Sequence, residues 1–139
     1  MLTRNLALVA LLLASLTSGA AFAQGELPPT MQGTWNASGS AVSGGTVIEV
    51  VKVSGPDAAE VRITMNDLAP RAPTAGAARC SFSEAAVARR QGDGWTVQVN
   101  SASCANVSIT LKWVQGKRRF EGQFKTDAGV TGTLFYEWV

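Results

Sequence analysis

The stretch VSITLKWVQGKRRFEGQFKTDAGVTGTLFYEWV, residues 107–139, decides the fold of this chain. Apolar and polar residues alternate along it, which is typical of β-strands that bury one face. Two short breaks interrupt the alternation, Gly116-Lys117 and Asp127-Ala128-Gly129, and both have the composition of hairpin turns. The stretch therefore predicts three consecutive antiparallel strands.

The two turns also fix which residues face each other. A two-residue loop at Gly116-Lys117, with glycine first, and a three-residue loop ending at Gly129 set the register of both hairpins. A slip of one residue would place Lys112 against Phe120, so the register is well specified. The predicted inner pairs are Trp113–Phe120, Ile109–Phe124, Gly122–Leu134 and Phe120–Tyr136, and the outer pairs are Lys112–Glu121 and Arg119–Glu137.

Upstream of residue 107, turn signals recur at short intervals between alternating segments. This pattern predicts an all-β fold, either a small antiparallel up-and-down barrel of about eight strands or a sandwich. The lead-in over 24–32 and the Pro- and Gly-containing segment 68–79 are expected to be irregular. The expected strands are 34–42, 46–53, 60–67, 80–90, 94–103, 106–115, 118–126 and 130–138.

The segment 80–99 supports two structures. Ser81 and Glu84 form a capping-box pattern before an alanine-rich run, which predicts one short helix near residues 82–90. The alternation on either side of Gly92 instead predicts a hairpin. Folding about Gly92 sets Val87 opposite Val97, Ala85 opposite Val99 and Cys80 opposite Cys104. We favour the hairpin, and the helix stays an alternative.

Residues 1–23 have the pattern of a secretory signal peptide. Arg4 supplies the positive start, residues 6–16 are apolar but too few to span a bilayer, and Ala21-Phe22-Ala23 is a small-residue cleavage site. We expect cleavage near Ala23/Gln24, a periplasmic or secreted product, and a single β-rich domain over residues 24–139. No second long apolar run follows, so no transmembrane helix is expected in the mature chain.

Cys80 and Cys104 are expected to form a disulfide, because an even cysteine pair in an exported chain is most simply a structural bridge. A redox or metal pair would need a closer spacing or histidine ligands, and the chain has no histidine. We therefore expect no metal site.

Catalytic and cofactor motifs are missing from the sequence. The lack of histidine removes the commonest general base, and no nucleophile elbow, P-loop or dinucleotide fingerprint is present. Without Arg4 the chain has 11 basic residues against 10 acidic ones, which gives no nucleic-acid signal. We expect no enzymatic activity, no cofactor and no nucleic-acid partner.

Two groups of residues are candidates for binding. The aromatic set on the inner face either packs as core or lines a cavity for a small apolar or sugar-like ligand; its members are Trp35, Trp95, Trp113, Phe120, Phe124, Tyr136 and Trp138. The second group lies near alternate turns, which share one end of a meander. These cations are either ordinary solvated turn residues or a rim for an anionic envelope macromolecule, and they are Lys52, Arg89, Arg90, Lys117, Arg118 and Arg119.

Gly33-Thr34-Trp35 resembles the G-x-W signature that opens the first strand of calycins, the group of lipocalin- and avidin-type barrels. The resemblance implies an antiparallel eight-stranded barrel that encloses a small ligand, with Trp35 as a barrel-floor residue. It covers about ten residues, and a ligand set does not carry over.

The sequence thus predicts an exported, soluble, non-catalytic binding protein of a bacterial-type envelope, holding a small ligand in a β-barrel. One alternative is a periplasmic inhibitor or envelope-interaction protein that acts on a macromolecule. Another is a small outer-membrane β-barrel, because alternation alone does not tell whether the apolar face points in or out.

Overall fold

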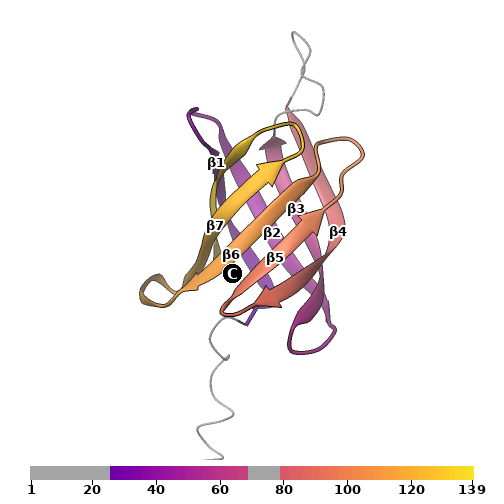
Figure 1. Ribbon diagram of the computed structural model, residues 1–139, viewed down its shortest axis with the longest axis vertical. Helices are drawn as coiled ribbons and strands as arrows, with labels where there is room; N and C mark the ends of the chain where they lie inside the picture. The colour runs from indigo at the N-terminus through magenta and orange to yellow at the C-terminus, as the bar shows by residue number, and fades with distance from the viewer. Residues whose placement is uncertain (1–25, 69–78) are drawn as a thin grey trace, which may run out of the picture.

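The chain forms a closed antiparallel barrel in which each strand pairs with the next and the first pairs with the last (Figure 1). This computed structural model describes residues 26–68 and 79–139, so the predicted signal peptide and most of the predicted 68–79 loop lie outside the described residues. The sandwich alternative is wrong. The strands are β1 (Thr30–Ala37), β2 (Ser43–Val53), β3 (Ala58–Leu68), β4 (Cys80–Gln91), β5 (Gly94–Val99), β6 (Val107–Val114), β7 (Arg119–Thr126) and β8 (Thr131–Trp138).

Alternate connections lie at the same end of the barrel, as an up-and-down topology requires. The lower end in Figure 1 carries the β2–β3, β4–β5 and β6–β7 turns, together with the start of β1 and the end of β8. The upper end carries the β1–β2, β5–β6 and β7–β8 connections. These two ends are called the lower end and the upper end below.

The register predicted for the last three strands is confirmed. Trp113 pairs with Phe120, Phe120 with Tyr136, and Lys112 with Glu121. Arg119 and Glu137, just beyond the last paired residues, form an ion pair at 3.5 Å. The two-residue turn at Gly116-Lys117 is wrong, because the last paired residues are Val114 and Arg119 and a 3-10 turn, η1 (Gln115–Lys117), occupies the connection. The left-handed residue of this turn is Arg118, with φ 53°, and not the glycine.

Residues 80–91 form strand β4, so the helix alternative near 82–90 is wrong. The hairpin that we favoured exists, but its predicted register is one residue out: Ala88 pairs with Val97, and Val87 pairs with Gln98. The turn contains Gly92 and Asp93 between the paired residues Gln91 and Gly94, so the axis of the hairpin lies between residues 92 and 93. Ala88 therefore points inward, and Val87 is 42% exposed.

Two strand boundaries also differ from the prediction. β1 begins at Thr30, inside the lead-in predicted to be irregular, because Met31 fills an inner position and pairs with β2 and β8. β5 ends at Val99 instead of continuing to 103, and the chain then turns to bring Cys104 into the core.

The interior of the barrel is filled with side chains. The largest fully buried residues are Trp35, Tyr136 and Phe120, and Met31, Ile63 and Met65 pack with them. The polar atom among these aromatics is satisfied, because the Tyr136 hydroxyl and Thr46 Oγ1 lie 2.7 Å apart in a buried hydrogen bond. Eight strands leave an interior about wide enough for such side chains.

The outer face is polar on β6 and β7. Ser108, Thr110 and Lys112 on β6, and Gln123 and Lys125 on β7, are all exposed. Within the described residues, no helix has both the length and the apolar character needed to cross a membrane.

The predicted disulfide is confirmed, with 5.7 Å between the Cα atoms of Cys80 and Cys104. It does not lie in a paired ladder as the register had predicted, because the pairing of β4 with β5 covers only Val87–Gln91 on the β4 side. The bridge instead joins the start of β4 to the connection between β5 and β6, beyond the point where those strands separate. It therefore holds the half of β4 that is paired only with β3.

Removing the bridge should loosen this half of β4. For a sequence separation of 24, the double variant Cys80→Ser/Cys104→Ser should lower the free energy of unfolding by about 3 kcal/mol. Hydrogen exchange should accelerate at residues 81–86 and much less at 87–91, measured against Ser103→Ala as a control. Uniform acceleration along β4 would show that the bridge has no local role.

Tyr136 tests whether the interior is dry. Burial raises the pKa of its phenol above the ordinary value of 10.0, and the hydrogen bond with Thr46 opposes this only in part. Tyr136 is the single tyrosine of the chain, so phenolate absorbance reports on it alone. Below pH 10 the phenol is neutral in both the folded and the unfolded states. Above pH 10 the unfolded chain gains stability by ionising, so the stability of the fold should fall as the pH rises further.

We expect no phenolate absorbance until the protein unfolds at alkaline pH, with circular dichroism and absorbance changing together. A phenolate signal near pH 10 with the β-sheet signal intact would mean that water reaches the centre of the barrel. Thr46→Val should leave absorbance and unfolding coupled.

Candidate ligand-binding pocket

The seven aromatic residues predicted to line a cavity fall into two groups. Trp35, Phe120, Phe124 and Tyr136 are at most 2% exposed and pack inside the barrel. Trp95 is 4% exposed, Trp113 is half-buried, and Trp138 is 46% exposed, near the lower end. The aromatic set is thus distributed along the whole interior and does not surround one central space.

The buried rings pack edge to face. The Trp35 and Phe124 ring centroids lie 5.7 Å apart, and those of Trp113 and Phe120 lie 5.1 Å apart, both in T-shaped geometry. These are favourable aromatic contacts, and they help to fill the interior of the barrel. Space for a ligand is therefore found toward the ends.

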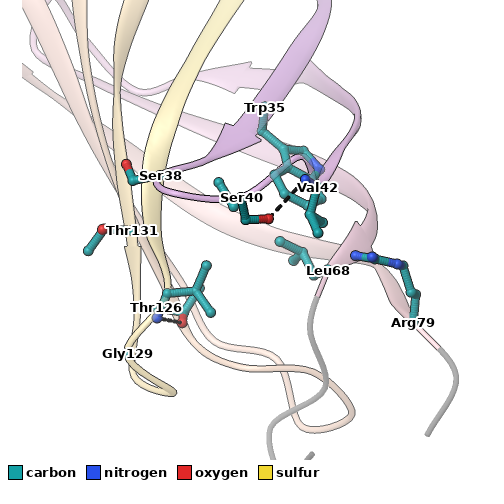
Figure 2. A pocket seen from close by; sticks show the side chains of 11 residues that line it. Trp35, Ser38, Ser40, Val42, Leu68, Arg79, Thr126, Gly129 and Thr131 are labelled. Carbon is teal, nitrogen blue, oxygen red and sulfur yellow. Dashed lines mark hydrogen bonds between the residues drawn. The ribbon is translucent and has the colours of Figure 1, made fainter. Parts of the chain in front are cut away.

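The upper end contains a pocket of about 530 Å³. Buried Trp35 and Leu68 form its inner boundary, and its apolar lining is completed by Ala37, Val42 and Val130. Figure 2 shows that Ser38 and Ser40 come from the β1–β2 connection, Thr126 and Thr131 from the ends of β7 and β8, and Arg79 from the start of β4. We call this the upper pocket.

Backbone hydrogen bonds hold the walls of the upper pocket in place. The N–H of Ala37 donates to the carbonyl of Val42 at 2.9 Å, and the N–H of Ser38 donates to the carbonyl of Thr131 at 2.8 Å. The β7–β8 turn has its predicted three-residue form, in which Gly129 adopts φ 86° and the N–H of Thr126 donates to the carbonyl of Val130. These bonds fix the backbone of the β1–β2 and β7–β8 connections at the upper pocket.

The indole of Trp35 is fixed by its own polar atom. Its Nε1–H donates to the carbonyl of Asn66 at 2.9 Å, which ties β1 to the end of β3. A Cβ atom at Gly44 would overlap the carbonyl oxygen of Asn66 and come within 2.7 Å of the indole Nε1, so the absence of a side chain there makes room for this hydrogen-bonded pair. Trp35 consequently presents a rigid apolar surface to the upper pocket.

Three polar side chains of the upper pocket each make a hydrogen bond with the protein backbone. Ser40 Oγ accepts the N–H of Val42 at 2.9 Å, and Thr126 Oγ1 accepts the N–H of Val130 at 3.1 Å, as the dashed lines in Figure 2 show. Arg79 Nη1 donates to the carbonyl of Asp67 at 3.2 Å, which holds the guanidinium beside Leu68.

A smaller slot of about 280 Å³ lies at the lower end. Leu27, Val50, Val53 and Trp95 line it, and Arg90 places its guanidinium 5.8 Å from the centre of the Trp95 ring. Leu27 comes from the lead-in to β1, whose Pro29 carbonyl accepts the N–H of Val50 at 2.8 Å. The lead-in thus packs against the lower end of the barrel.

The six predicted rim cations lie near the three turns of the lower end, but they are not equally available. Glu121 accepts from Lys117 at 3.2 Å and from Arg119 at 2.6 Å, and Arg119 also lies 3.5 Å from Glu137. Hydrogen bonds from Arg119 and Lys117 lower the pKa of Glu121, so the carboxylate stays charged at neutral pH. Lys52, Arg89 and Arg118 are exposed.

The sequence prediction missed the upper pocket. Apart from Trp35, which the sequence analysis had named, its residues are mostly small hydroxyl and apolar side chains without a motif, from strand ends and connections that lie far apart in the sequence. The sequence did contain one indication of it. Alternate turns of an up-and-down barrel lie at the same end, so the connections near 38–42 and 127–130 had to lie close together. The conformations of those connections decide whether they leave a hollow, and composition does not reveal this.

No family model, curated protein or solved structure matches this chain. In the two described segments, no group of three or more His, Cys, Asp or Glu residues is placed to hold a metal ion.

Proposed function

We propose that this protein is an exported, non-catalytic binding protein that holds a small, largely apolar molecule in the upper pocket. The observation that carries the proposal is the pocket itself. Its volume of about 530 Å³ lies within the range of about 300–1,000 Å³ common for ligand sites, and a few polar groups surround an apolar interior. Its walls are fixed by backbone bonds, so a ligand would bind without an ordering cost.

Two further features support export. The first 23 residues have the pattern of a signal peptide, and a disulfide such as Cys80–Cys104 persists in oxidising compartments. The resemblance of Gly33-Thr34-Trp35 to the calycin opening strand supports a small-ligand role as well. In this chain Trp35 is buried and lines the upper pocket.

The chemistry of the pocket favours binding over catalysis. Among the described residues lining it, Arg79 is the titratable one, and a guanidinium stays protonated and does not serve as a general acid or base at neutral pH. The serine and threonine hydroxyls have no histidine partner, because the chain contains none.

The alternatives have less support. An inhibitor or envelope-interaction role at the cationic rim is weakened because Lys117 and Arg119 are paired with Glu121. An outer-membrane barrel needs an apolar outer band, whereas exposed Lys112 and Lys125 project from adjacent strands here.

A filled pocket should lose its ligand. Ala37→Phe places a ring in the upper pocket, and Ala85→Phe places the same ring on the exposed outer face of β4. With the neutral fluorescent probe phenylnaphthylamine, we expect Ala37→Phe to weaken binding at least about tenfold, a loss of roughly 1.4 kcal/mol, and Ala85→Phe to leave it unchanged.

Native mass spectrometry of protein from its own host provides the second readout. Wild type and Ala85→Phe should carry the same small added mass, and Ala37→Phe should not. Equal probe binding by all three proteins, or a retained mass in Ala37→Phe, would place binding elsewhere.

A further inference from the structure

We propose that the ligand of the upper pocket is a monocarboxylate with an apolar body, and that Arg79 binds its carboxylate at the mouth. This inference rests on the proposed function, because it names the chemical class that the same pocket selects. It follows from the hydrogen-bonding character of the lining, from the position of Arg79 and from the shape of the apolar part.

The polar groups of the upper pocket are arranged to donate. Ser40 Oγ and Thr126 Oγ1 each already accept a backbone N–H, from Val42 and Val130 respectively. A hydroxyl that accepts in this way keeps its O–H for donation. The guanidinium of Arg79 contains only donors, and its bond to Asp67 uses one of about five. A ligand rich in acceptors therefore matches the lining.

The charge of the lining residues also favours a ligand with an anionic group. Arg79 is cationic, and none of the described residues that line the upper pocket is acidic. Asp67 and Asp127 are sequence neighbours of lining residues but do not line the pocket themselves, and the carboxylate of Asp127 accepts the N–H of Asn106 at 3.0 Å. An anionic group at the mouth would thus lie near the positive charge of Arg79, and no carboxylate among the described lining residues would repel it.

The fold places Arg79 at this point. Asp67 adopts the left-handed conformation, with φ 65°, where the pairing of β3 with β4 shifts between Met65 and Leu68. Such a backbone conformation is unfavourable in a residue with a side chain, and here it presents the Asp67 carbonyl to Arg79. On the other side, Arg79 adjoins Cys80, which the disulfide anchors. In Figure 2 the guanidinium points toward Leu68 and the pocket.

The apolar interior excludes a ligand that is polar throughout. Trp35 and Leu68 lie deepest, and Val42 and Val130 line the sides, while the hydroxyls and Arg79 come from the connections and strand ends. A ligand that satisfies both parts has an apolar body directed inward and one carboxylate directed outward. A guanidinium pairs with carboxylates through two parallel hydrogen bonds, which suits this head group.

Decanoate and decanol test the inference, because they share a chain and differ in the head group. Isothermal titration should show that wild type binds decanoate about tenfold more tightly than decanol. Arg79→Gln should lower decanoate affinity to the level of decanol and leave decanol unchanged. Arg89→Gln, which removes an exposed cation from the lower end, should retain the full preference.

The outcomes separate the two proposals. Decanol binding without a preference for decanoate in wild type, or a preference that survives Arg79→Gln, overturns the carboxylate assignment and leaves the proposed function standing. A preference lost in Arg89→Gln also overturns it, because the carboxylate would then lie at the lower end. If neither compound nor phenylnaphthylamine binds, the proposed function fails, and the assignment fails with it.

Discussion

The pairing of β1 with β8 is the interaction on which the rest of the structure depends. It turns a sheet into a closed ring of eight strands, and closure limits the interior to about the width of packed side chains. Two glycines permit it: a side chain at Gly33 would overlap the carbonyl of Phe135, and one at Gly132 would overlap the carbonyl of Asn36. Trp35, Phe120 and Tyr136 fill the interior, and the upper pocket lies where the strands end.

The two ends of the barrel differ in what packs against them. At the lower end the lead-in packs on the barrel, and Glu121 pairs with two of the turn cations. At the upper end the disulfide holds a half-paired strand, the Asp67 carbonyl beside the shift in β3 accepts from Arg79, and two connections line the pocket with Trp35. Departures from a regular ladder occur at both ends: β2 shifts register between Val50 and Lys52 at the lower end, and β3 shifts between Met65 and Leu68 at the upper end, where the upper pocket lies.

Alternation and turn chemistry predicted most of the fold because both act locally. The pair Trp113–Phe120 followed from side-chain parity, and it survived an error in the turn because Gln115 and Arg118 unpair without changing the register. The β4–β5 register failed because the placement of Cys80 opposite Cys104 assumed a continuous ladder. The upper pocket could not be predicted, since it depends on the conformations of connections that alternation does not describe. The aromatic set was found, but the sequence does not tell a filled interior from a hollow one.

The central claim is that the upper pocket is the binding site, and chemical-shift mapping tests it most directly. In a titration of isotope-labelled protein with decanoate, backbone amide shifts should concentrate at residues 37–42, 79–80 and 126–131. Residues 52–57, 92–94 and 115–118 at the lower end should remain unperturbed. Saturable shifts centred on the lower-end turns, or on the Leu27 and Trp95 slot, would contradict the account.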